Sequence, residues 1–334
     1  MLGNEVSTFE NDFANFIGTK FCIGVASGSD ALKIALTSVG IGTGSRVLTV
    51  ANAGMYSSNA IFAVGATPIY IDIDERNMLL DFERLSDFES LNIDALIVTH
   101  LFGLAHPKIE EIAVWCKSHS VVLIEDCAQA HGASISGKLV GTFGDLSCFS
   151  FYPTKNLGAL GDAGAVLTNS PDLKDSITSL RQYGWKNKYH VALKGGMNSR
   201  LDELQAAILN LFLPHLDLWN SRRRQIARSY CTQINHPLVD TPAEFSDNYV
   251  SHLFVIRTKH RKSLISHLSQ SGVGTDIHYP VPDHMQVAYE DSNLKIELPI
   301  TEQCCNEIVT VPCFPELSDE EIDKVCTAIN EWKS

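Results

Sequence analysis

The sequence contains no long hydrophobic run. No stretch of its 334 residues approaches the roughly 20 uninterrupted apolar residues that a transmembrane helix needs. The opening residues Met1-Leu-Gly-Asn-Glu also lack the charged and apolar regions of a signal peptide. We therefore expect a soluble cytoplasmic protein with no membrane partner.

Paired cysteine motifs are absent as well. The chain has nine cysteines but no C-x-x-C pair, and the adjacent Cys304 and Cys305 can hardly bridge each other. Most of the cysteines lie within apolar runs, which is typical of small buried hydrophobic residues. We therefore expect neither disulfides nor a metal site.

The chain as a whole has no excess of positive charge. Its formal net charge of −13 argues against nonspecific binding to nucleic acid. One segment differs, because residues 176–200 contain no Asp or Glu and have a local charge of +5 from five basic residues: Arg181, Lys186, Lys188, Lys194 and Arg200. This segment is either a solvated loop or an electropositive rim for a phosphate or diphosphate group.

Short β-rich runs alternate with helical patterns over the first two-thirds of the chain. We predict strands at 46–50, 68–73, 95–100, 120–126, 147–151 and 164–169. We predict helices at 29–39, 55–64, 108–119 and 171–182. Nearly continuous apolar strands separated by helices indicate an α/β fold with a mostly parallel sheet covered on both faces. Ligands of such sheets gather at the carboxyl ends of the strands.

Longer helical patterns dominate the remaining third. The segment 201–230 has helical apolar spacing, and Pro214 is expected to kink or break it. A strand at 250–258 and a helix near 261–271 follow. A terminal helix is expected to begin at Ser318, where S-D-E-E resembles a capping box. We therefore predict a large domain at 1–210 and a smaller α+β domain at 211–334.

The stretch 24-GVASGSDALKIAL-36 places small and hydroxyl residues at the start of a helix. Several free backbone N–H groups and the positive end of the helix dipole would then face one point, which suits a phosphate. The alternative is an ordinary helix N-cap supplied by Ser29 or Asp30. Ser27, Gly28 and Ser29 are therefore candidate phosphate-binding residues.

Two charged residues follow neighbouring predicted strands. Asp126 ends an apolar strand, where an unpaired buried carboxylate is costly and needs a cation. Lys155 follows the next strand, in the stretch SFYPTKNLGALGDAGAV, and so lies at the same edge of the sheet. Partial desolvation there would lower its pKa and make a neutral amine available to attack an aldehyde. Gln129 and His131 follow Asp126 within one turn, and either reach the same site or are satisfied polar groups beside it.

A phosphate cup, a buried aspartate and an amine together match the needs of pyridoxal 5′-phosphate. The cup would hold the phosphate, Asp126 would keep the pyridine nitrogen protonated, and Lys155 would form the Schiff base. With that nitrogen protonated, the ring accepts electrons from the reacting carbon. The sequence therefore predicts pyridoxal 5′-phosphate as the cofactor.

Five stretches carry a family resemblance. In chain order they are SGSDAL, EDCAQAHGA, SFYPTKNLGALGDAGAV, GMNSRLDELQAAIL and HYPVPDHMQVAY. Together they resemble the nucleotide-sugar aminotransferases of the family named after the DegT, DnrJ, EryC1 and StrS proteins, from about Gly3 to the C-terminus. The resemblance implies the fold of type I pyridoxal-phosphate enzymes, with a seven-stranded, mostly parallel sheet in the large domain and a smaller C-terminal domain.

The resemblance also implies roles for the matching residues. Lys155 would bind the cofactor covalently and carry the proton of the reaction, and Asp126 would pair with the pyridinium. Gln129 would contact the side of the ring that bears the 3-oxygen. The phosphate would be bound by Gly28, Ser29 and Ser150, beside Ser27.

A shared active site is a further implication. Asn198 would reach the phosphate of the neighbouring subunit's cofactor, which makes the enzyme a homodimer. The basic loop just before Asn198 would then lie near the nucleotide diphosphate bound to the partner subunit. Three residues of that loop are candidate substrate contacts: Lys186, Lys188 and Tyr189.

The D-x-x-Q-x-H-G pattern at 126–132 narrows the expected substrate. Together with TVANAG at 49–54 and HYPVPDH at 278–284, it resembles relatives that aminate dTDP-linked 3-keto-6-deoxyhexoses. His131 would then assist at the sugar, and further substrate candidates are His278, Tyr279 and His284. We predict C3 amination with L-glutamate as donor, in deoxyamino-sugar or surface polysaccharide biosynthesis.

Two features depart from the family pattern. Relatives carry a further segment, including a helix, before the Leu-Gly-x-Glu-Val stretch at which this chain begins, and its loss would impair activity or dimer stability. The aromatic residue that stacks on the cofactor ring in many relatives falls on Gly54. Tyr56 or another residue would have to replace it, so Tyr56 is a candidate cofactor contact.

Other functions are weaker alternatives. A dehydratase is disfavoured, because relatives that use the cofactor for deoxygenation have His at the position of Lys155. A catalytically impaired homologue that only binds the cofactor would have lost Lys155, Asp126 or Gln129, yet all three are present, and only the short N-terminus favours it. An aminotransferase for 4-keto or UDP-linked sugars stays open.

Overall fold

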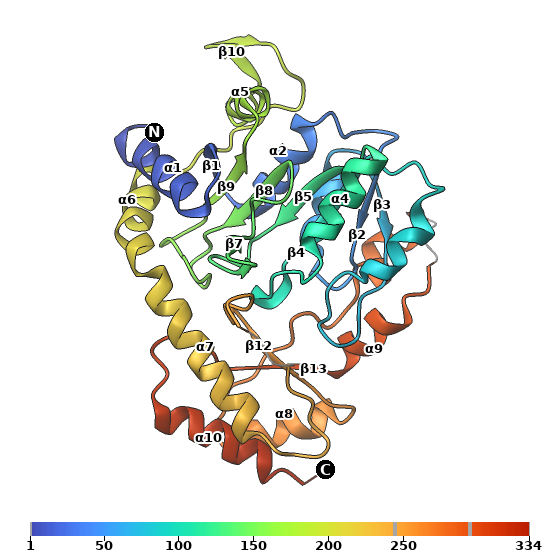
Figure 1. The fold of residues 1–334 in the computed structure, drawn as a ribbon, viewed down its shortest axis with the longest axis vertical. Coiled ribbons are helices and arrows are strands. Elements are labelled where there is room, and N and C mark those ends of the chain that lie inside the picture. Colours follow the sequence, from blue (N-terminus) through green and yellow to red (C-terminus); the bar gives the residue numbers. More distant parts are fainter. Residues whose placement is uncertain (1, 243–245, 293–295, 334) are drawn as a thin grey trace.

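The computed structural model describes residues 2–242, 246–292 and 296–333 (Figure 1). Its α-helices are α1 (Asn4–Ile17), α2 (Gly28–Ser38), α3 (Tyr56–Ala63), α4 (Ile109–His119), α5 (Pro171–Leu180), α6 (Glu203–Phe212), α7 (Leu216–Gln233), α8 (Arg261–Gln270), α9 (Pro299–Glu307) and α10 (Asp319–Asn330). Its strands are β1 (Phe21–Val25), β2 (Arg46–Thr49), β3 (Thr67–Tyr70), β4 (Ala95–Thr99), β5 (Val122–Asp126), β6 (Ser134–Ile135), β7 (Lys138–Leu139), β8 (Leu146–Ser150), β9 (Gly164–Thr168), β10 (Trp185–Asn187), β11 (His190–Val191), β12 (Phe254–Arg257) and β13 (Ile308–Val311). Short 3-10 helices are η1 (Phe82–Phe88), η2 (Leu101–Gly103), η3 (Leu213–His215), η4 (Asp283–Met285) and η5 (Val287–Ser292).

Seven strands form the main sheet in the order β1-β9-β8-β5-β4-β2-β3. Strands β8, β5, β4, β2 and β3 pair in parallel, whereas β9 is antiparallel to both β8 and β1. The predicted seven-stranded, mostly parallel α/β sheet is therefore confirmed. Strand β1 and helix α1 were not predicted. All residues of β1 after Phe21 are buried, so its sequence shows no alternation of buried and exposed residues. The strand that it pairs with, β9, lies far along the chain.

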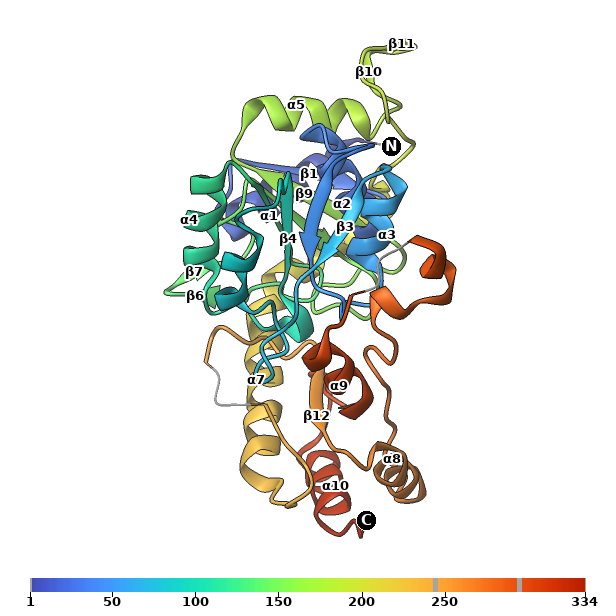
Figure 2. The same cartoon turned by 90° about the vertical axis from the view of Figure 1, so that its right-hand side faces the viewer.

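Helices cover both faces of this sheet, because successive strand residues point to opposite sides. Ile97 of β4 packs with α2, α3 and α5, whereas Val98 packs on the side of α4. Cys148 of β8 likewise faces the α2 side, and Phe149 faces α1. There the ring of Phe13 meets Phe149 edge to face at 5.0 Å. Figure 2 shows α4 on one side of β4, with α2 and α3 on the other.

The helical segment at 201–230 is interrupted as predicted. Pro214 lies in η3, between α6 and α7. Helix α7 then leads from the sheet to a smaller part of the molecule with β12, β13, α8 and α10 (Figure 1). The predicted boundary between 210 and 211 falls in the last turn of α6 and stays a prediction. The capping box at α10 is confirmed, because Ser318 Oγ accepts a hydrogen bond from Glu321 N and the Glu321 carboxylate accepts one from Ser318 N.

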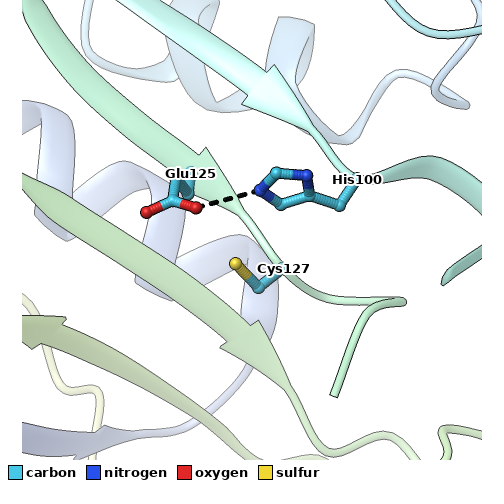
Figure 3. A group of neighbouring side chains, drawn as sticks. All are labelled: His100, Glu125 and Cys127. Carbon is cyan, nitrogen blue, oxygen red and sulfur yellow. Dashed lines mark hydrogen bonds and ion pairs between the residues drawn. The ribbon is translucent and has the colours of Figure 1, made fainter. Parts of the chain in front are cut away.

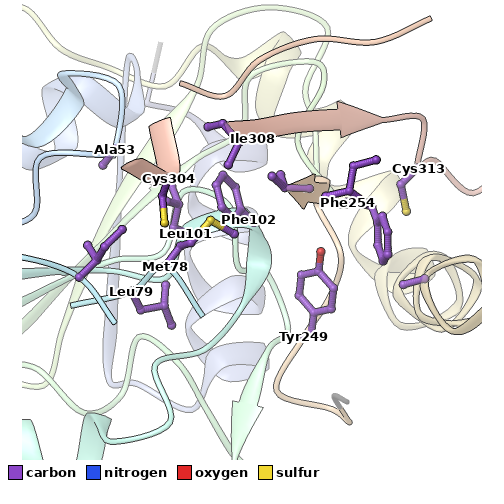
Figure 4. Close-up of a cluster of buried hydrophobic side chains, with 14 of the residues drawn as sticks. Ala53, Met78, Leu79, Leu101, Phe102, Tyr249, Phe254, Cys304, Ile308 and Cys313 are labelled. Atoms are coloured by element: carbon purple, nitrogen blue, oxygen red, sulfur yellow. The ribbon is translucent and has the colours of Figure 1, made fainter. Parts of the chain in front are cut away.

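One buried cluster joins the large and small parts (Figure 4). Met78, from a loop beside the sheet, and Phe102 of η2 belong to the same apolar core as Phe254 of β12 and Ile308 of β13. Residues far apart in sequence therefore share one interior. This core fixes the position of the small part against the carboxyl edge of the sheet.

The cysteines contribute to the interior as predicted. All nine are free, and all except Cys231 are buried. No helix among the described residues has the length and apolar character that crossing a membrane would require.

Candidate active site

A cavity of about 1060 Å³ opens at the carboxyl edge of the sheet. Thr99, Asp126 and Ser150, the last residues of β4, β5 and β8, all line it. Thr99 pairs in register with Asp126. The cavity therefore lies where the sequence analysis expects the site, at the carboxyl ends of parallel strands. The sequence analysis did not select Thr99, although it ends its strand in the same way as Asp126.

Asp126 and Lys155 line this cavity together. Asp126 is 4% exposed, and its Oδ1 accepts a hydrogen bond from Ala128 N at 3.1 Å. Burial raises the pKa of the Asp126 carboxyl, while the Ala128 N–H and the Lys155 charge oppose the rise. Burial lowers the pKa of Lys155 to about 8, and the Asp126 charge opposes that fall. A substantial share of the Lys155 amine is therefore neutral slightly above neutral pH.

The N-terminus of α2 forms another part of the cavity wall. Ser27 is the N-cap, and its Oγ accepts a hydrogen bond from Asp30 N at 3.1 Å. Gly28 lies so near β8 that a Cβ atom at position 28 would stand 2.6 Å from the Cβ of Ser150. Ser27, Gly28, Ser29 and Ser150 all line the cavity, so the structure brings together the predicted phosphate-binding residues.

The structure shows why one of the glycines that follow Lys155, Gly164, has no side chain. It begins β9 and lies against the backbone of Ser27 and Gly28, where a Cβ atom would overlap the Ser27 carbonyl group. A side chain at position 164 would therefore push the N-terminus of α2 away from the sheet. Gly158 is in a similar position, since its Cβ would stand 2.6 Å from the Pro153 carbonyl oxygen.

Gln129 and two tyrosines form the opposite part of the cavity. Gln129 Nε2 donates a hydrogen bond to the Tyr279 hydroxyl at 3.1 Å, and Gln129 Oε1 accepts one from Phe102 N. The ring of Tyr279 lies against Gly54 and meets the ring of Tyr56 edge to face at 5.9 Å. Burial raises the pKa of the Tyr279 hydroxyl well above its ordinary value. Tyr279 and Tyr56 therefore both face the space in front of Gly54.

His131 occupies a different place from the other predicted residues. It is fully buried and is not part of the cavity wall. Its ring lies 5.5 Å from those of Phe149 and Phe151, and it interacts with the backbone of Ser150. Burial, with the Lys155 charge adding to it, lowers the pKa of His131 to about 3. His131 is therefore a neutral core residue beside β8, the strand that precedes Lys155.

The two histidines of HYPVPDH are also separated. His278 lines the cavity, and its Nδ1 lies 2.9 Å from Thr310 Oγ1. Burial lowers the pKa of His278. His284 lies outside the cavity wall, and its Nε2 is 3.1 Å from Glu302 Oε1. Of the two, only His278 faces the site.

The basic segment lies away from this cavity. Lys186, Lys188 and Tyr189 lie on or between β10 and β11, a hairpin that projects from the body of the molecule (Figures 1 and 2). Tyr189 is 76% exposed, although it is large and apolar, and Lys188 Nζ lies 5.1 Å from the centre of its ring. Asn198 is also exposed. Within one chain, none of these residues reaches the cavity.

Several cavity residues had no clear signal in the sequence. Asn156 follows Lys155, and its side chain links Asn220, Val250 and His252. Arg223 of α7 and His252 also line the cavity, and they come from the part of the chain beyond the main sheet. Adjacency to Lys155 could have identified Asn156. The other two depend on how α7 packs against the segment before β12, which local patterns do not reveal.

A second polar cluster lies inside the sheet (Figure 3). His100, Glu125 and Cys127 have candidate ligand atoms within 4.8 Å of one another. The Glu125 carboxylate lies 3.0 Å from His100 Nε2 and accepts hydrogen bonds from three backbone N–H groups, those of Gly141, Phe143 and Gly144. His100 Nδ1 accepts one from the backbone of His106. Because the polar atoms of His100 and Glu125 are already paired, these two side chains form a hydrogen-bonded brace for the 141–144 loop.

Comparisons with known proteins find similar chains that are aminotransferases. The transaminase for dTDP-3-amino-3,6-dideoxy-alpha-D-galactopyranose from Aneurinibacillus thermoaerophilus is 43% identical over 333 residues, covering 99% of this chain and 91% of that protein. The crystal structure of DesV from S. venezuelae, in complex with a ketimine intermediate, superposes with a TM-score of 0.94 at 38% identity, covering 99% of this chain and 90% of that one. NtdA from Bacillus subtilis, with its cofactor PMP bound, gives a TM-score of 0.92 at 29% identity, covering 98% and 76%.

The family assignment follows from the sequence match. Residues 1–330 match the family model described as the DegT/DnrJ/EryC1/StrS aminotransferase family. The match includes all five stretches that carried the resemblance, and the solved relatives share the fold. The chain therefore belongs to the DegT/DnrJ/EryC1/StrS aminotransferase family.

Proposed function

We propose that this protein moves an amino group from L-glutamate to the C3 keto group of a dTDP-linked 3-keto-6-deoxyhexose, with pyridoxal 5′-phosphate as cofactor. The observation that carries the proposal is the meeting of Lys155, Asp126 and the α2 N-terminus in one cavity. When bound, the cofactor supplies an aldehyde that exchanges amino groups and a ring that takes up electrons.

The residues present fit this cofactor. Gly28 leaves room beside Ser150 that a Cβ would fill, and the free N–H groups of the α2 N-terminus suit a phosphate. Asp126 is a buried carboxylate whose negative charge would keep a pyridine nitrogen protonated. Lys155, with its pKa near 8, can attack as a neutral amine and then move a proton at its Nζ.

The remaining wall residues would orient the cofactor and the sugar. Gln129 would contact the ring's 3-oxygen side, and Tyr279 or Tyr56 would cover the ring at the place that Gly54 leaves free. His278 is in a position to contact the sugar. His131 lies behind the cavity wall, so its contribution in this arrangement is to pack against Phe149 and Phe151, before Lys155 in the chain.

The proposed enzyme is a cytoplasmic homodimer with shared active sites. The exposed Asn198 and the projecting hairpin support this, because in a single chain they contact no part of the cavity. In the dimer Asn198 would reach the phosphate of the other subunit's cofactor, and Lys186, Lys188 and Tyr189 would contact the nucleotide diphosphate. Mixing Lys155→Ala protein with Asn198→Ala protein should restore part of the activity that each lacks alone. Failure to complement would contradict shared sites.

Cofactor binding has a direct spectroscopic test. Protein mixed with pyridoxal 5′-phosphate should show the visible absorption band of lysine-bound cofactor, and Lys155→Ala should lack it. Adding L-glutamate should convert the wild-type spectrum to that of pyridoxamine phosphate. A wild-type protein without the band is inconsistent with the proposed function, whereas a band that glutamate does not change points to a different donor or to an impaired homologue.

The sugar and nucleotide are tested separately. The pyridoxamine form should be incubated with 3-keto and 4-keto sugars linked to dTDP or UDP, and the products identified by mass spectrometry and NMR. The name of the Aneurinibacillus relative favours a dTDP-linked sugar aminated at C3. Preferential conversion of a 4-keto or UDP-linked sugar would instead support the alternative substrate class.

A further inference from the structure

His252 lines the same cavity as Lys155. It lies in the segment before β12 and is 7% exposed. Its Nδ1 is 3.0 Å from Oδ1 of Asn156, the residue that follows Lys155 in the chain. Among the charged groups that act on the His252 ring, Lys155 has the largest effect. One side of this ring is therefore held by the residue next to the reacting lysine.

Two backbone carbonyls determine which atoms donate in this contact. A carbonyl oxygen can only accept a hydrogen bond, so the Asn220 atom that lies 2.7 Å from the His131 carbonyl oxygen is the amide nitrogen Nδ2. For the same reason, the Asn156 atom that lies 3.0 Å from the Val250 carbonyl oxygen is Nδ2. This nitrogen also donates to Asn220 Oδ1 at 2.8 Å. The Asn156 atom that faces His252 is therefore the acceptor Oδ1.

The protonation of the His252 ring follows from this arrangement. Because Asn156 Oδ1 can only accept, Nδ1 of His252 must carry a proton. Burial lowers the pKa of His252 well below its ordinary value, and the charges of Lys155 and Arg223 lower it further, so the ring is neutral. A neutral imidazole has a single N–H group. Nε2 of His252 therefore has an unshared electron pair and can only accept a hydrogen bond.

Nε2 of His252 has no partner in the described part of the chain. The hydrogen bond of this ring uses Nδ1, and Nε2 is not among the enclosed polar atoms without a partner, so a ligand in the cavity can reach it. A neutral acceptor attracts an O–H or N–H group, whereas it repels the oxygen atoms of an anion. The cavity wall therefore selects for a ligand that can donate a hydrogen bond at this point.

The two reactants of the proposed function differ in what they can donate. L-Glutamate has two carboxylates, which can only accept, and an amine that has to react with the cofactor. A 3-keto-6-deoxyhexose has hydroxyl groups on the carbons that flank its keto group, C2 and C4. The thymine base of dTDP also has an N–H group, but the proposed place of the nucleotide is at the hairpin of the partner subunit. Beside Lys155, the sugar is therefore the reactant that suits His252.

We propose that Nε2 of His252 accepts a hydrogen bond from a hydroxyl group of the sugar, on one of the two carbons that flank the keto group. This inference rests on the proposed function, because it assigns part of the same cavity to the sugar substrate. A sugar without this hydroxyl group would leave Nε2 desolvated and unpaired, which costs free energy. His252 therefore determines specificity among keto sugars and has no contact with the amino donor.

The test measures binding of an unreactive analogue, dTDP-6-deoxyglucose, which has hydroxyl groups but no keto group. In calorimetry, the wild-type protein loaded with pyridoxamine phosphate should bind it about tenfold more tightly than a counterpart that lacks the hydroxyl group at C2 or at C4. His252→Phe keeps a ring but removes the acceptor, so it should lose this preference. His119→Phe is the matched control, because His119 is exposed on α4 outside the cavity and should keep the preference.

Two further measurements separate sugar binding from other roles of His252. Its replacement also removes the partner of Asn156 Oδ1, and a resulting shift of Lys155 would slow the half-reaction with L-glutamate without removing a preference between sugars. A slower half-reaction with an unchanged preference would therefore overturn the proposal and leave His252 as a positioning residue. Binding of dTDP alone should be equal in wild type and His252→Phe, and a loss as large as that of the analogue would place the partner of Nε2 on the nucleotide instead.

The wild-type protein provides a test that does not depend on folding of the variant. If it binds dTDP-6-deoxyglucose and both deoxygenated counterparts equally, the proposal is wrong. Failure of the proposed function itself would appear earlier, as protein that never forms the absorption band of lysine-bound cofactor.

Discussion

The ring of Tyr279 lies against the backbone of Gly54, with ring carbons 2.9 Å from the place where a Cβ at position 54 would stand. The family pattern places an aromatic residue at position 54. In this protein the aromatic ring at that place comes instead from the HYPVPDH loop, more than half the chain away. Tyr279 also accepts a hydrogen bond from Gln129, so the ring is fixed from two sides.

Gly54→Ala should displace Tyr279 and weaken cofactor binding. Gly54 has φ +73°, where an alanine costs about 1 kcal/mol, and the clash with the ring adds to that cost. Gly40→Ala is the matched control, because Gly40 has φ +79° and nothing within 4 Å of its Cβ position. Urea unfolding and titration with pyridoxal phosphate check both variants. If Gly54→Ala and Gly40→Ala lose the same stability and Gly54→Ala keeps its cofactor affinity, the contact between Gly54 and Tyr279 has no role in cofactor binding.

Gly28→Ala should weaken phosphate binding by displacing Ser150. The helix start at position 28 accepts alanine readily, so the effect comes from the 2.6 Å approach to the Ser150 Cβ. We expect the dissociation constant for pyridoxal phosphate to rise about tenfold, the loss expected from one charge-assisted hydrogen bond. Gly42→Ala, whose nearest contact is 3.7 Å away, should bind the cofactor like wild type. An unchanged dissociation constant in Gly28→Ala would argue against the phosphate cup.

Asp283 should make stability depend on pH. Its carboxylate is buried and accepts hydrogen bonds from Met55 N and Ser58 Oγ, which ties the HYPVPDH loop to the segment beside Gly54. Burial raises its pKa from 3.8 to about 7. The folded state therefore binds more protons than the unfolded state between these values, and the free energy of unfolding falls as the pH rises through this window.

The expected loss from Asp283 between pH 5 and pH 8 is roughly 2–3 kcal/mol. Asp283→Asn should lack this part of the pH dependence in urea unfolding. Asp12→Asn, a change at an exposed position in α1, should keep it. If the free energy of unfolding changes with pH equally in Asp283→Asn and wild type, Asp283 is not the source of this pH dependence.

Glu125→Ala should destabilise the fold without involving a metal. It removes the acceptor of three backbone N–H groups and of His100, and breaking a buried pair in this way costs about 3–5 kcal/mol. Glu125→Gln keeps one acceptor oxygen and should cost less. Because the polar atoms of His100 and Glu125 in Figure 3 are already paired, chelator or added Zn²⁺ should leave the melting temperature of wild type unchanged. A zinc-dependent rise would show that the cluster is a metal site.

Lys186→Ala with Lys188→Ala should raise KM for the sugar nucleotide and leave the half-reaction with L-glutamate unchanged. The two lysines lie on the projecting hairpin, and their proposed partner is the diphosphate bound to the other subunit. The increase in KM over wild type should be smaller at high salt, because salt already screens the attraction between exposed lysines and the diphosphate. Lys174→Ala, at an exposed pair with Asp175 on α5, is the control. Equal effects on both half-reactions would contradict a contact between the hairpin and the diphosphate.

Much of the site could be predicted from local sequence because strand ends determine it. Asp126 and Ser150 end neighbouring parallel strands, so their proximity followed from the alternation of strands and helices. His131 shows the limit of that reasoning. It follows Asp126 by only five residues, yet the turn directs its ring into the core between Phe149 and Phe151. Arg223 reaches the cavity through long-range packing, which no spacing in the sequence encodes. Tyr279 was selected from the HYPVPDH motif alone, and its contact with Gly54 depends on the same kind of packing.

The apolar cluster of Figure 4 has a consequence for how substrates enter. Separating the small part from the sheet would expose Met78, Phe102, Phe254 and Ile308 to water, at a cost of about 1.5–3 kcal/mol for each fully buried side chain. Rigid-body opening of the two parts is therefore too costly to accompany every turnover. Substrates would therefore have to reach Lys155 through the cavity without separation of the small part from the sheet.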